Sequence, residues 1–297
     1  MDNAELNERR NARFDDVVGD APLETLADGF GFLEGPTWHP ARRALVFSDI
    51  TGSAMYSWSN GRAAVYREAS NYAVGNAYDR SGRLVTCEHG TSRVVRETES
   101  GAIEVLAESF DGKGLNSPND VVVSSWGGVY FTDPPFGRTV EGFGVVRELE
   151  LDFCGVYGLQ PGDDELALVS ADLTLPNGLC FSLDETVLYV NDTARDHIRR
   201  FVRHGDRFDD AGVWATTVGE GDGHPDGMKF DQAGNLYCTG PGGIHVFDPD
   251  ATCLGVLRVP ELVANFAFGD DDMRTLYICA STTLYRCRVR VPGPAAF

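Results

Sequence analysis

A two-strand phrase occurs six times along this 297-residue chain, and it constrains the fold more than any other feature. Each copy has an apolar run, a turn rich in Gly, Asp and Asn, and a second run rich in Leu, Tyr and Val. The second runs are LVFSD from Leu45, LVTCE from Leu84, VYFTD from Val129, LYVND from Leu188, LYCTG from Leu236 and LYICA from Leu276. Subtracting these start positions gives intervals of 39, 45, 59, 48 and 40 residues. Repeats of this length with paired strands are typical of β-propeller blades.

The spacing therefore predicts an all-β fold, a six-bladed β-propeller of four-stranded antiparallel blades. Third strands are expected after each phrase, at residues 145–151 in the third repeat. Fourth strands follow only five of the phrases, so residues 22–27 (PLETLA) are expected to complete the last blade and close the ring. Residues 1–21 are interpreted as a polar extension and residues 22–297 as a single propeller domain. The longest interval predicts a loop over one face near residues 134–145.

Charge and cysteine content narrow the class of partner. A net charge of −20 argues against binding nucleic acid or an anionic membrane surface, because both are negatively charged. The chain has no apolar stretch long enough to span a bilayer, and its start lacks the apolar core of a signal peptide. Seven cysteines without CxxC spacing are expected to be reduced thiols, which favours the cytoplasm. The oligomeric state is left open.

Alignment of the six first strands brings one position into register. The strands are FLEGPTW, YAVGNAY, SPNDVVV, LPNGLCF, HPDGMKF and LVANFAF, and the shared position holds Glu34, Val74, Asn119, Asn177, Asp226 and Ala264. Innermost strands surround the channel of a propeller, so these residues are expected to form a ring, which we call the channel ring. Its two carboxylates and two amides are hard oxygen donors that suit Ca²⁺ or Mg²⁺, and the absence of His and Cys argues against structural zinc.

A structural alternative is that Asn and Asp at these positions only cap turns. That alternative explains PND, PNG and PDG one at a time. It does not explain Glu34, and it does not explain why the copies at Val74 and Ala264 lack a polar group.

Hairpin geometry returns the end of each second strand to the face where the first strand began. The residues expected at this rim are Asp49, Glu88, His89, Asp133, Asn191 and Asp192. Glu88, His89 and Asp133 are interpreted either as groups that bind substrate hydroxyls or orient the metal ligands, or as strand-end turn formers. No GxSxG, HExxH or Walker pattern is present, so a serine-hydrolase or nucleotide mechanism has no support.

Several motifs together resemble the SMP-30/gluconolactonase family of six-bladed propellers, from about Leu33 to the C-terminus. CEHG, LNSPND, FTDPPFG, PNGL and PDG are most similar to bacterial gluconolactonases. The resemblance implies that Glu34, Asn119, Asn177 and Asp226 surround a divalent ion. It also implies hydrolysis of sugar-acid lactones, although some relatives act on organophosphates. Animal members carry an Arg where this chain has Ser117, as the bacterial branch does, so other groups must recognise the sugar here.

The expected activity is therefore a lactonase with one divalent cation, Ca²⁺ first and Zn²⁺, Mn²⁺, Mg²⁺ or Fe²⁺ as alternatives. A small-molecule lactone is the expected partner. Asp226 is predicted to be the general base and Glu34 mainly a ligand, although these two roles could be reversed. Asn119 is expected to contact substrate as well as metal. Hydrolysis of other esters or phosphotriesters at the same ion, and a propeller that binds ligands without catalysis, are the alternatives.

Overall fold

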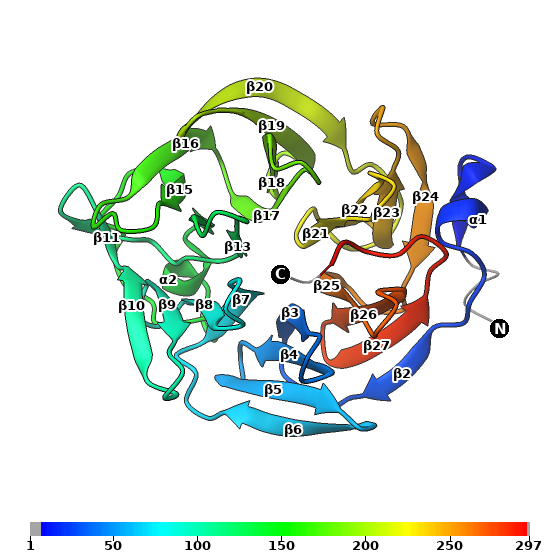
Figure 1. The fold of residues 1–297 in the computed structure, drawn as a ribbon, viewed down its shortest axis with the longest axis horizontal. Helices are drawn as coiled ribbons and strands as arrows, with labels where there is room; N and C mark the ends of the chain where they lie inside the picture. Colours follow the sequence, from blue (N-terminus) through cyan, green and yellow to red (C-terminus); the bar gives the residue numbers. More distant parts are fainter. Residues whose placement is uncertain (1–6, 296–297) are drawn as a thin grey trace.

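The computed structural model describes residues 7–295 and arranges them as six antiparallel sheets around a central channel (Figure 1). This confirms the predicted six-bladed propeller. The first three blades are made, from the channel outward, by β3 (Leu33–His39), β4 (Ala44–Asp49), β5 (Ala54–Ser59) and β6 (Arg62–Arg67); by β7 (Ala73–Tyr78), β8 (Leu84–Glu88), β9 (Arg93–Glu97) and β10 (Ile103–Ala107); and by β13 (Val121–Val123), β14 (Val129–Asp133), β15 (Cys154–Leu159) and β16 (Ala167–Leu173).

The remaining three blades complete the ring. They are made by β17 (Pro176–Phe181), β18 (Val187–Asp192), β19 (His197–His204) and β20 (Arg207–Thr216); by β21 (Met228–Phe230), β22 (Leu236–Gly240), β23 (Gly243–Phe247) and β24 (Cys253–Arg258); and by β25 (Val263–Gly269), β26 (Thr275–Ala280), β27 (Thr283–Arg288) and β2 (Glu24–Ala27). A short hairpin of β11 (Ser109–Phe110) and β12 (Lys113–Gly114) lies between the second and third blades.

Ring closure uses the N-terminal strand that the sequence predicts. β2 pairs antiparallel with β27, with Glu24 opposite Arg286 and Thr25 opposite Tyr285. The guanidinium of Arg286 also donates to Glu24 at 2.8 Å. The last blade is therefore completed by the start of the propeller, which leaves no unpaired edge on β27.

The strand predicted at residues 145–151 is wrong. The third strand of that blade is β15, whose Val156 and Tyr157 lie opposite Thr132 and Phe131 of β14. Residues 134–153 instead form a loop that contains the short helix α2 (Phe136–Thr139). The apolar residues of 145–151 resemble a strand in sequence but are not buried as one. Val146 is 60% exposed in this loop, whereas Val156 and Tyr157 are fully buried. Burial against the neighbouring sheet decided which apolar segment became the strand.

The segment before β2 packs on the outside of the fifth and sixth blades. β1 (Glu8–Arg9) pairs with β24 as a fifth strand, and α1 (Arg13–Val17) follows it. Phe14 of this helix is fully buried in the same apolar cluster as Leu254 and Phe266. Residues 1–6 of the predicted extension, and residues 296–297, lie outside the described residues. Neither α1 nor α2, the two helices of the described chain, is long and apolar enough to cross a membrane.

The hydrophobic core lies between the faces of neighbouring blades. Leu45 and Phe47 of the first blade pack with Tyr277 and Leu284 of the sixth in one buried cluster. Each of the six blades contributes to such a cluster, so the sheets are held around the channel by apolar contact. The innermost strands are thereby fixed at the positions that carry the channel ring.

Candidate metal centre

The structure brings the six positions of the channel ring to successive inner strands. Glu34 lies in β3 and Asn177 in β17, whereas Asn119 and Asp226 lie two residues before β13 and β21 begin. Backbone hydrogen bonds join neighbouring ring positions. Gly75, which follows Val74, donates to the carbonyl of Asn119 at 2.8 Å, and Gly227 donates to the carbonyl of Ala264 at 2.8 Å. These bonds hold the inner strands of neighbouring blades together at the level of the ring.

Glycines after the ring residues allow this close approach. A Cβ at Gly35 would lie 1.9 Å from the carbonyl oxygen of Val74, and one at Gly178 would lie 1.9 Å from that of Asp226. Any side chain there would push neighbouring blades apart. The EGP and PNG motifs therefore set the spacing between blades as well as carrying ligands.

Polar side chains from the second strands tie three of the ring residues to the preceding blade. Ser48 donates from Oγ to the carbonyl of Val74 at 2.8 Å, and Thr132 donates to the carbonyl of Asn177 at 2.7 Å. Asn191 donates in the same way to the carbonyl of Asp226. The inner strands cannot shift along the channel axis without breaking these buried bonds.

Two buried oxygens on the ring have no hydrogen-bond partner among the described residues. Glu34 is 3% exposed; its Oε2 accepts from the backbone of Gly35 and from Asn265, and its Oε1 accepts nothing. Asn177 is 4% exposed; its Nδ2 donates to Thr193 at 3.1 Å, so its Oδ1 is the unpartnered atom. Buried oxygens without partners are costly unless a cation or ordered water satisfies them.

Asp226 contacts both of these groups. Its carboxyl group lies close enough to Glu34 and to Asn177 for both residues to influence its ionisation. The pKa of Asp226 is raised well above its ordinary value by burial and by the neighbouring carboxylate of Glu34, and burial raises the pKa of Glu34 as well. Two adjacent carboxylates with no cation between them repel each other, so each is more easily protonated. A divalent ion at the ring would remove this repulsion.

The donor set therefore fits a hard divalent cation. Glu34, Asn177 and Asp226 converge, and Asn119, 6% exposed, occupies the equivalent position of the third blade. Across residues 7–295 no three His, Cys, Asp or Glu side chains form a metal cluster, because two of the four oxygen donors are asparagines. Four protein oxygens leave coordination positions for water or substrate.

The rim residue Glu88 lies at the end of β8 and is engaged in the surrounding loops. Its Oε2 accepts from Asn71 at 3.1 Å and from Thr91 at 2.7 Å. Arg67 lies 3.9 Å from its other oxygen. These contacts hold two loops beside the ring together.

His89 is fully buried beside Glu88, and one of its nitrogens is unused. Nδ1 lies 2.9 Å from the carbonyl of Phe143, which can only accept, so Nδ1 carries the proton. Burial lowers the pKa of His89 to about 4, so the ring is neutral and Nε2 is an acceptor. Nε2 has no partner among the residues that the structure describes. The loop of residues 134–153 thus selects the tautomer of His89.

Asp133, at the end of β14, is also fully buried. Its Oδ2 accepts from the backbone nitrogen of Asn116 at 2.8 Å, and its Oδ1 has no partner in the described chain. Burial raises its pKa to about 7. Asp49, the corresponding residue of the first blade, accepts from the backbones of Gly31 and Phe32, so it forms the turn that precedes β3.

Sequence reasoning missed three polar residues beneath the ring. Asn265 donates to Glu34, Asp120 has a buried Oδ2 without a partner in residues 7–295, and Lys229 approaches Asn265. Two of these residues could have been found in the sequence. The residue directly after each ring position is glycine in four blades, and in the other two it is Asp120 or Asn265. Non-glycine residues at such crowded positions mark side chains that fill the channel itself.

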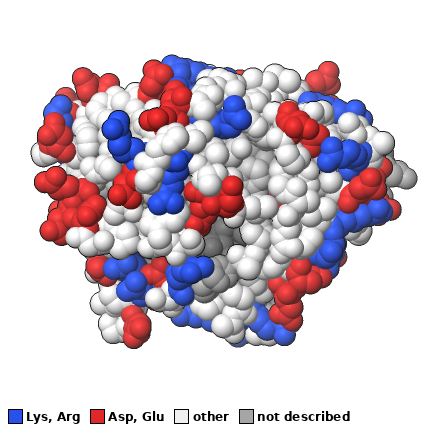
Figure 2. Space-filling model, turned by 45° about the horizontal axis from the view of Figure 1, so that its top comes forward, with Lys and Arg blue, Asp and Glu red and all other residues white. Residues whose placement is uncertain are grey.

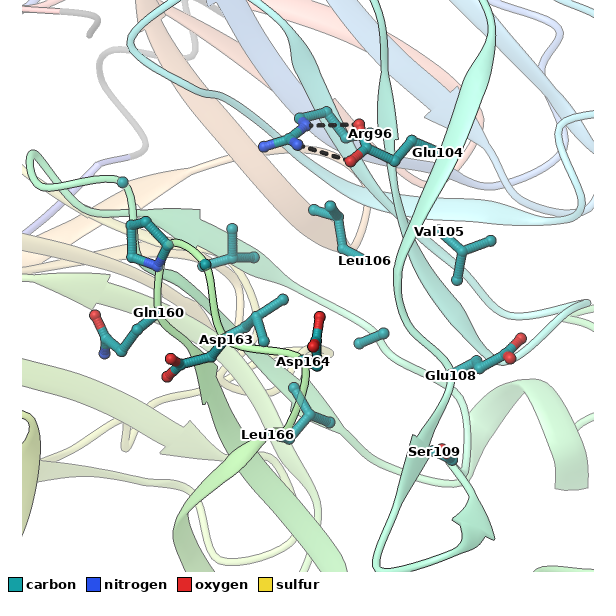
Figure 3. A pocket seen from close by; sticks show the side chains of 16 residues that line it. Arg96, Glu104, Val105, Leu106, Glu108, Ser109, Gln160, Asp163, Asp164 and Leu166 are labelled. Carbon is teal, nitrogen blue, oxygen red and sulfur yellow. Dashed lines mark hydrogen bonds and ion pairs between the residues drawn. The ribbon is translucent and has the colours of Figure 1, made fainter.

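A separate groove of about 540 Å³ lies on the outside, between the second and third blades (Figure 3). Arg96 and Glu104 form a two-bonded ion pair on one wall, at 2.9 and 3.3 Å, and Asp163 and Asp164 lie on the other. No residue of the channel ring lines this groove. It plays no part in the candidate centre.

Comparison with known proteins shows which family the chain is similar to. Residues 32–282 match the family model described as the SMP-30/gluconolactonase/LRE-like region. A gluconolactonase of Zymomonas mobilis is 31% identical, over 92% of this chain and 82% of the relative. The pentonolactonase XacC of Haloferax volcanii is 29% identical, over 82% of this chain and 80% of its own.

A solved structure agrees with these relatives. The structure of a gluconolactonase from Xanthomonas campestris superposes with a TM-score of 0.89 at 35% identity, covering 95% of this chain and 94% of that one. The likeness therefore extends over nearly the whole chain. The chain belongs to the SMP-30/gluconolactonase/LRE-like family.

Proposed function

We propose that this protein is a metal-dependent lactonase that hydrolyses a sugar-acid lactone to the open-chain acid. The observation that carries the proposal is the convergence of Glu34, Asn177 and Asp226, with two buried oxygens that lack partners among the described residues. Membership of the family and near full-length likeness to gluconolactonases support the substrate class.

Glu34, Asn119, Asn177 and Asp226 would hold one divalent cation, for which Ca²⁺ is the first candidate because all four ligands are hard oxygens. When bound, such an ion polarises the lactone carbonyl and stabilises the negative charge that develops on its oxygen. Asn265 holds Glu34 in place for this role through its 3.0 Å hydrogen bond.

Asp226 is the proposed general base. It is less buried than the other three proposed ligands, and its backbone is fixed by Thr239 at 2.8 Å and by Asn191. In the reaction, a water oxygen bonds to the carbonyl carbon while Asp226 takes the water proton. The ring ester bond then breaks, and the proton passes to the leaving hydroxyl oxygen. Glu34, with its buried carboxylate, acts mainly as ligand.

Substrate hydroxyls would meet Asn119 and the rim of Glu88, His89 and Asp133. His89 is the best suited of these, because its neutral Nε2 can accept a hydrogen bond from a hydroxyl group. Glu88 and Asp133 contribute mainly by holding the rim loops through Asn71 and Asn116.

The test is a substrate panel on purified protein. Metal content is measured first, and release of acid from γ- and δ-aldonolactones is then followed by pH-stat before and after chelation. Lactone hydrolysis that disappears on chelation and returns with Ca²⁺ supports the proposal, and Asn177→Ala should weaken metal binding. Full activity in metal-free protein would refute the metal role.

The same panel separates the alternatives. Phosphotriester turnover that exceeds lactone turnover would favour the ester-hydrolase alternative on this site. Tight binding of lactone without turnover would favour a ligand-binding propeller.

We also propose a reducing compartment, the cytoplasm. All seven cysteines are free thiols in the structure, and Cys87, Cys238 and Cys279 are fully buried. Such thiols are typical of proteins that do not meet an oxidising environment. The net charge of −20 supports a small-molecule partner over nucleic acid or an anionic membrane.

A further inference from the structure

The end of the channel opposite the ring opens into a second cavity, which we call the distal cavity. First strands run away from the ring, and the distal cavity is lined by residues that come later in these strands and by the turns that follow them. Its volume is about 680 Å³, within the usual range for small-molecule pockets. Figure 2 shows the molecule hollowed near its centre, with acidic and basic side chains at the edge of the hollow.

Lys229 lies on the inner wall of the distal cavity, three residues after Asp226. The chain has only two lysines, Lys113 and Lys229, among 25 basic residues, so the channel carries an ammonium where the rest of the protein uses arginine. Lys229 donates to Oδ1 of Asn265 at 3.5 Å, and that oxygen already accepts from the backbone of Phe266 at 2.9 Å. No carboxylate of residues 7–295 lies within 4.0 Å of the ammonium.

The ammonium is therefore poorly satisfied. It has three donors, and its one bond to Asn265 is at the limit of hydrogen-bond length. A partly buried ammonium with unused donors favours an anion, because charge-assisted bonds to a carboxylate are the strongest it can make.

The walls around Lys229 are mainly apolar. Trp38, Phe181, Phe230 and Phe268 line the cavity, and the indole nitrogen of Trp38, which is 5% exposed, has no partner within the described chain. The walls thus offer aromatic surface to the body of a ligand, with the hydroxyl groups of Thr37, Ser124, Ser125 and Ser182 between the apolar groups.

The acidic residues at the edge of the cavity are already engaged. Asp184 accepts from Ser182 at 2.7 Å, and Glu185 accepts from the backbone of Ser125 at 2.9 Å. Neither forms an ion pair with Lys229. Asp120 and Glu34, deeper in the channel, feel the positive charge of Lys229. They form no ion pair with it among the described residues, so the donors of the ammonium that face the cavity remain available to an external anion.

We propose that the distal cavity binds a small organic carboxylate with an apolar body. Its carboxylate accepts from the ammonium of Lys229, and its body packs on Trp38 and the neighbouring phenylalanines. None of the four proposed metal ligands lines the distal cavity, and the amide of Asn265 separates Lys229 from Glu34. It does not depend on the proposed lactonase activity.

The two lysines make a direct test possible. Full-length protein grown on lysine labelled with ¹³C at Cε shows two lysine side-chain signals by NMR, and Lys113, exposed on β12, is the internal reference. Benzoate is the probe, and uncharged benzamide of the same shape is its control. We expect benzoate to shift the Lys229 signal in a saturable way, leave Lys113 unchanged, and bind at least about tenfold more tightly than benzamide.

Variants separate binding at Lys229 from binding elsewhere. Lys229→Met should weaken benzoate by about tenfold or more, Lys229→Arg should retain much of the affinity, and Lys113→Met should change nothing. Unfolding curves check that each variant is folded. If Lys229→Met is unfolded, the labelled wild-type titration decides alone.

Three outcomes would overturn the proposal. The first is a Lys229 signal that does not move with benzoate up to about 10 mM, well above typical ligand affinities. The second is equal binding of benzoate and benzamide. The third is binding that occurs only in a variant ending at Ala295, which would assign the cavity to the last two residues of the chain.

Discussion

Asn265 donates a hydrogen bond from Nδ2 to Oε2 of Glu34 at 3.0 Å, and so joins the sixth blade to a proposed metal ligand on the first. The backbone of Phe266 donates to Oδ1 of the same amide at 2.9 Å, which fixes the amide with its NH₂ group toward Glu34. The sixth blade has Ala264 at its ring position and contributes no ligand there. Its contribution is made one residue later, through a side chain that positions a ligand from another blade.

Replacement of Asn265 by Leu should therefore weaken metal binding. The change removes the donor that holds Oε2 of Glu34, and loss of such a partner typically lowers metal affinity about 10- to 100-fold. Calorimetric titration of metal-free protein with Ca²⁺ measures the change. Asn235→Leu is the matched control, because Asn235 is an equally buried amide that bonds to Asp231 in a hairpin turn. Equal losses of affinity in the two variants would show that the effect is merely structural.

Asp226→Asn should separate the ligand from the base. The amide keeps an oxygen donor and nearly the same shape, but it cannot take a proton from water. We expect the fold and part of the metal affinity to persist while kcat falls about a hundred- to ten-thousand-fold. The measurement is kcat at saturating metal, because added ion restores occupancy but not a missing base. Recovery of near-normal kcat would make Asp226 a ligand only and move the search to Glu34, Glu88, His89 and Asp133.

The N-terminal segment should stabilise the propeller in two steps. A chain that begins at residue 22 loses α1 with the fully buried Phe14, and loss of such an aromatic side chain alone costs about 3–5 kcal/mol. A chain that begins at residue 31 also loses β2 and exposes the edge of β27. The midpoint of urea unfolding should therefore be highest for the full chain, lower for the chain that begins at residue 22, and lowest for the chain that begins at residue 31. Equal midpoints for the full chain and the second truncation would contradict closure by β2.

The buried, neutral His89 predicts a loss of stability in acid. Burial lowers its pKa to about 4 in the folded protein, against about 6.5 for an unperturbed histidine. Between these values the unfolded chain binds more protons, so this contribution is intact above pH 6.5 and falls by roughly 3 kcal/mol as the pH drops to 4. His89→Gln should flatten this part of the pH profile of unfolding. It should also impair lactone hydrolysis if Nε2 accepts a substrate hydroxyl.

His245→Gln is the matched control for that experiment. His245 is buried in β23 of the fifth blade, and burial lowers its pKa to about 4 as well. Its replacement should flatten the same pH window without impairing hydrolysis. Impairment of hydrolysis by both variants, or by neither, would refute a specific substrate role for His89.

Much of the architecture was readable because a propeller repeats itself. Each blade must place one strand at the channel, so six phrases in register identify the channel ring, with Glu34 and Asp226 among its members, without any knowledge of the third dimension. The missing fourth strand identified β2 for the same reason. Local alternation failed at residues 145–151, because only packing against Phe131 and Thr132 could choose Val156 and Tyr157 as the strand.

The sequence by itself determined the number of blades, the closing strand and the ring of oxygen donors, since these follow from periodicity. Only the tertiary structure decided what each donor touches. It showed Asn265 beneath Glu34, Phe143 selecting the tautomer of His89, and Lys229 at the inner wall of the distal cavity. These contacts join residues 54 to 231 positions apart, and they depend on the packing of whole blades, which no local pattern records.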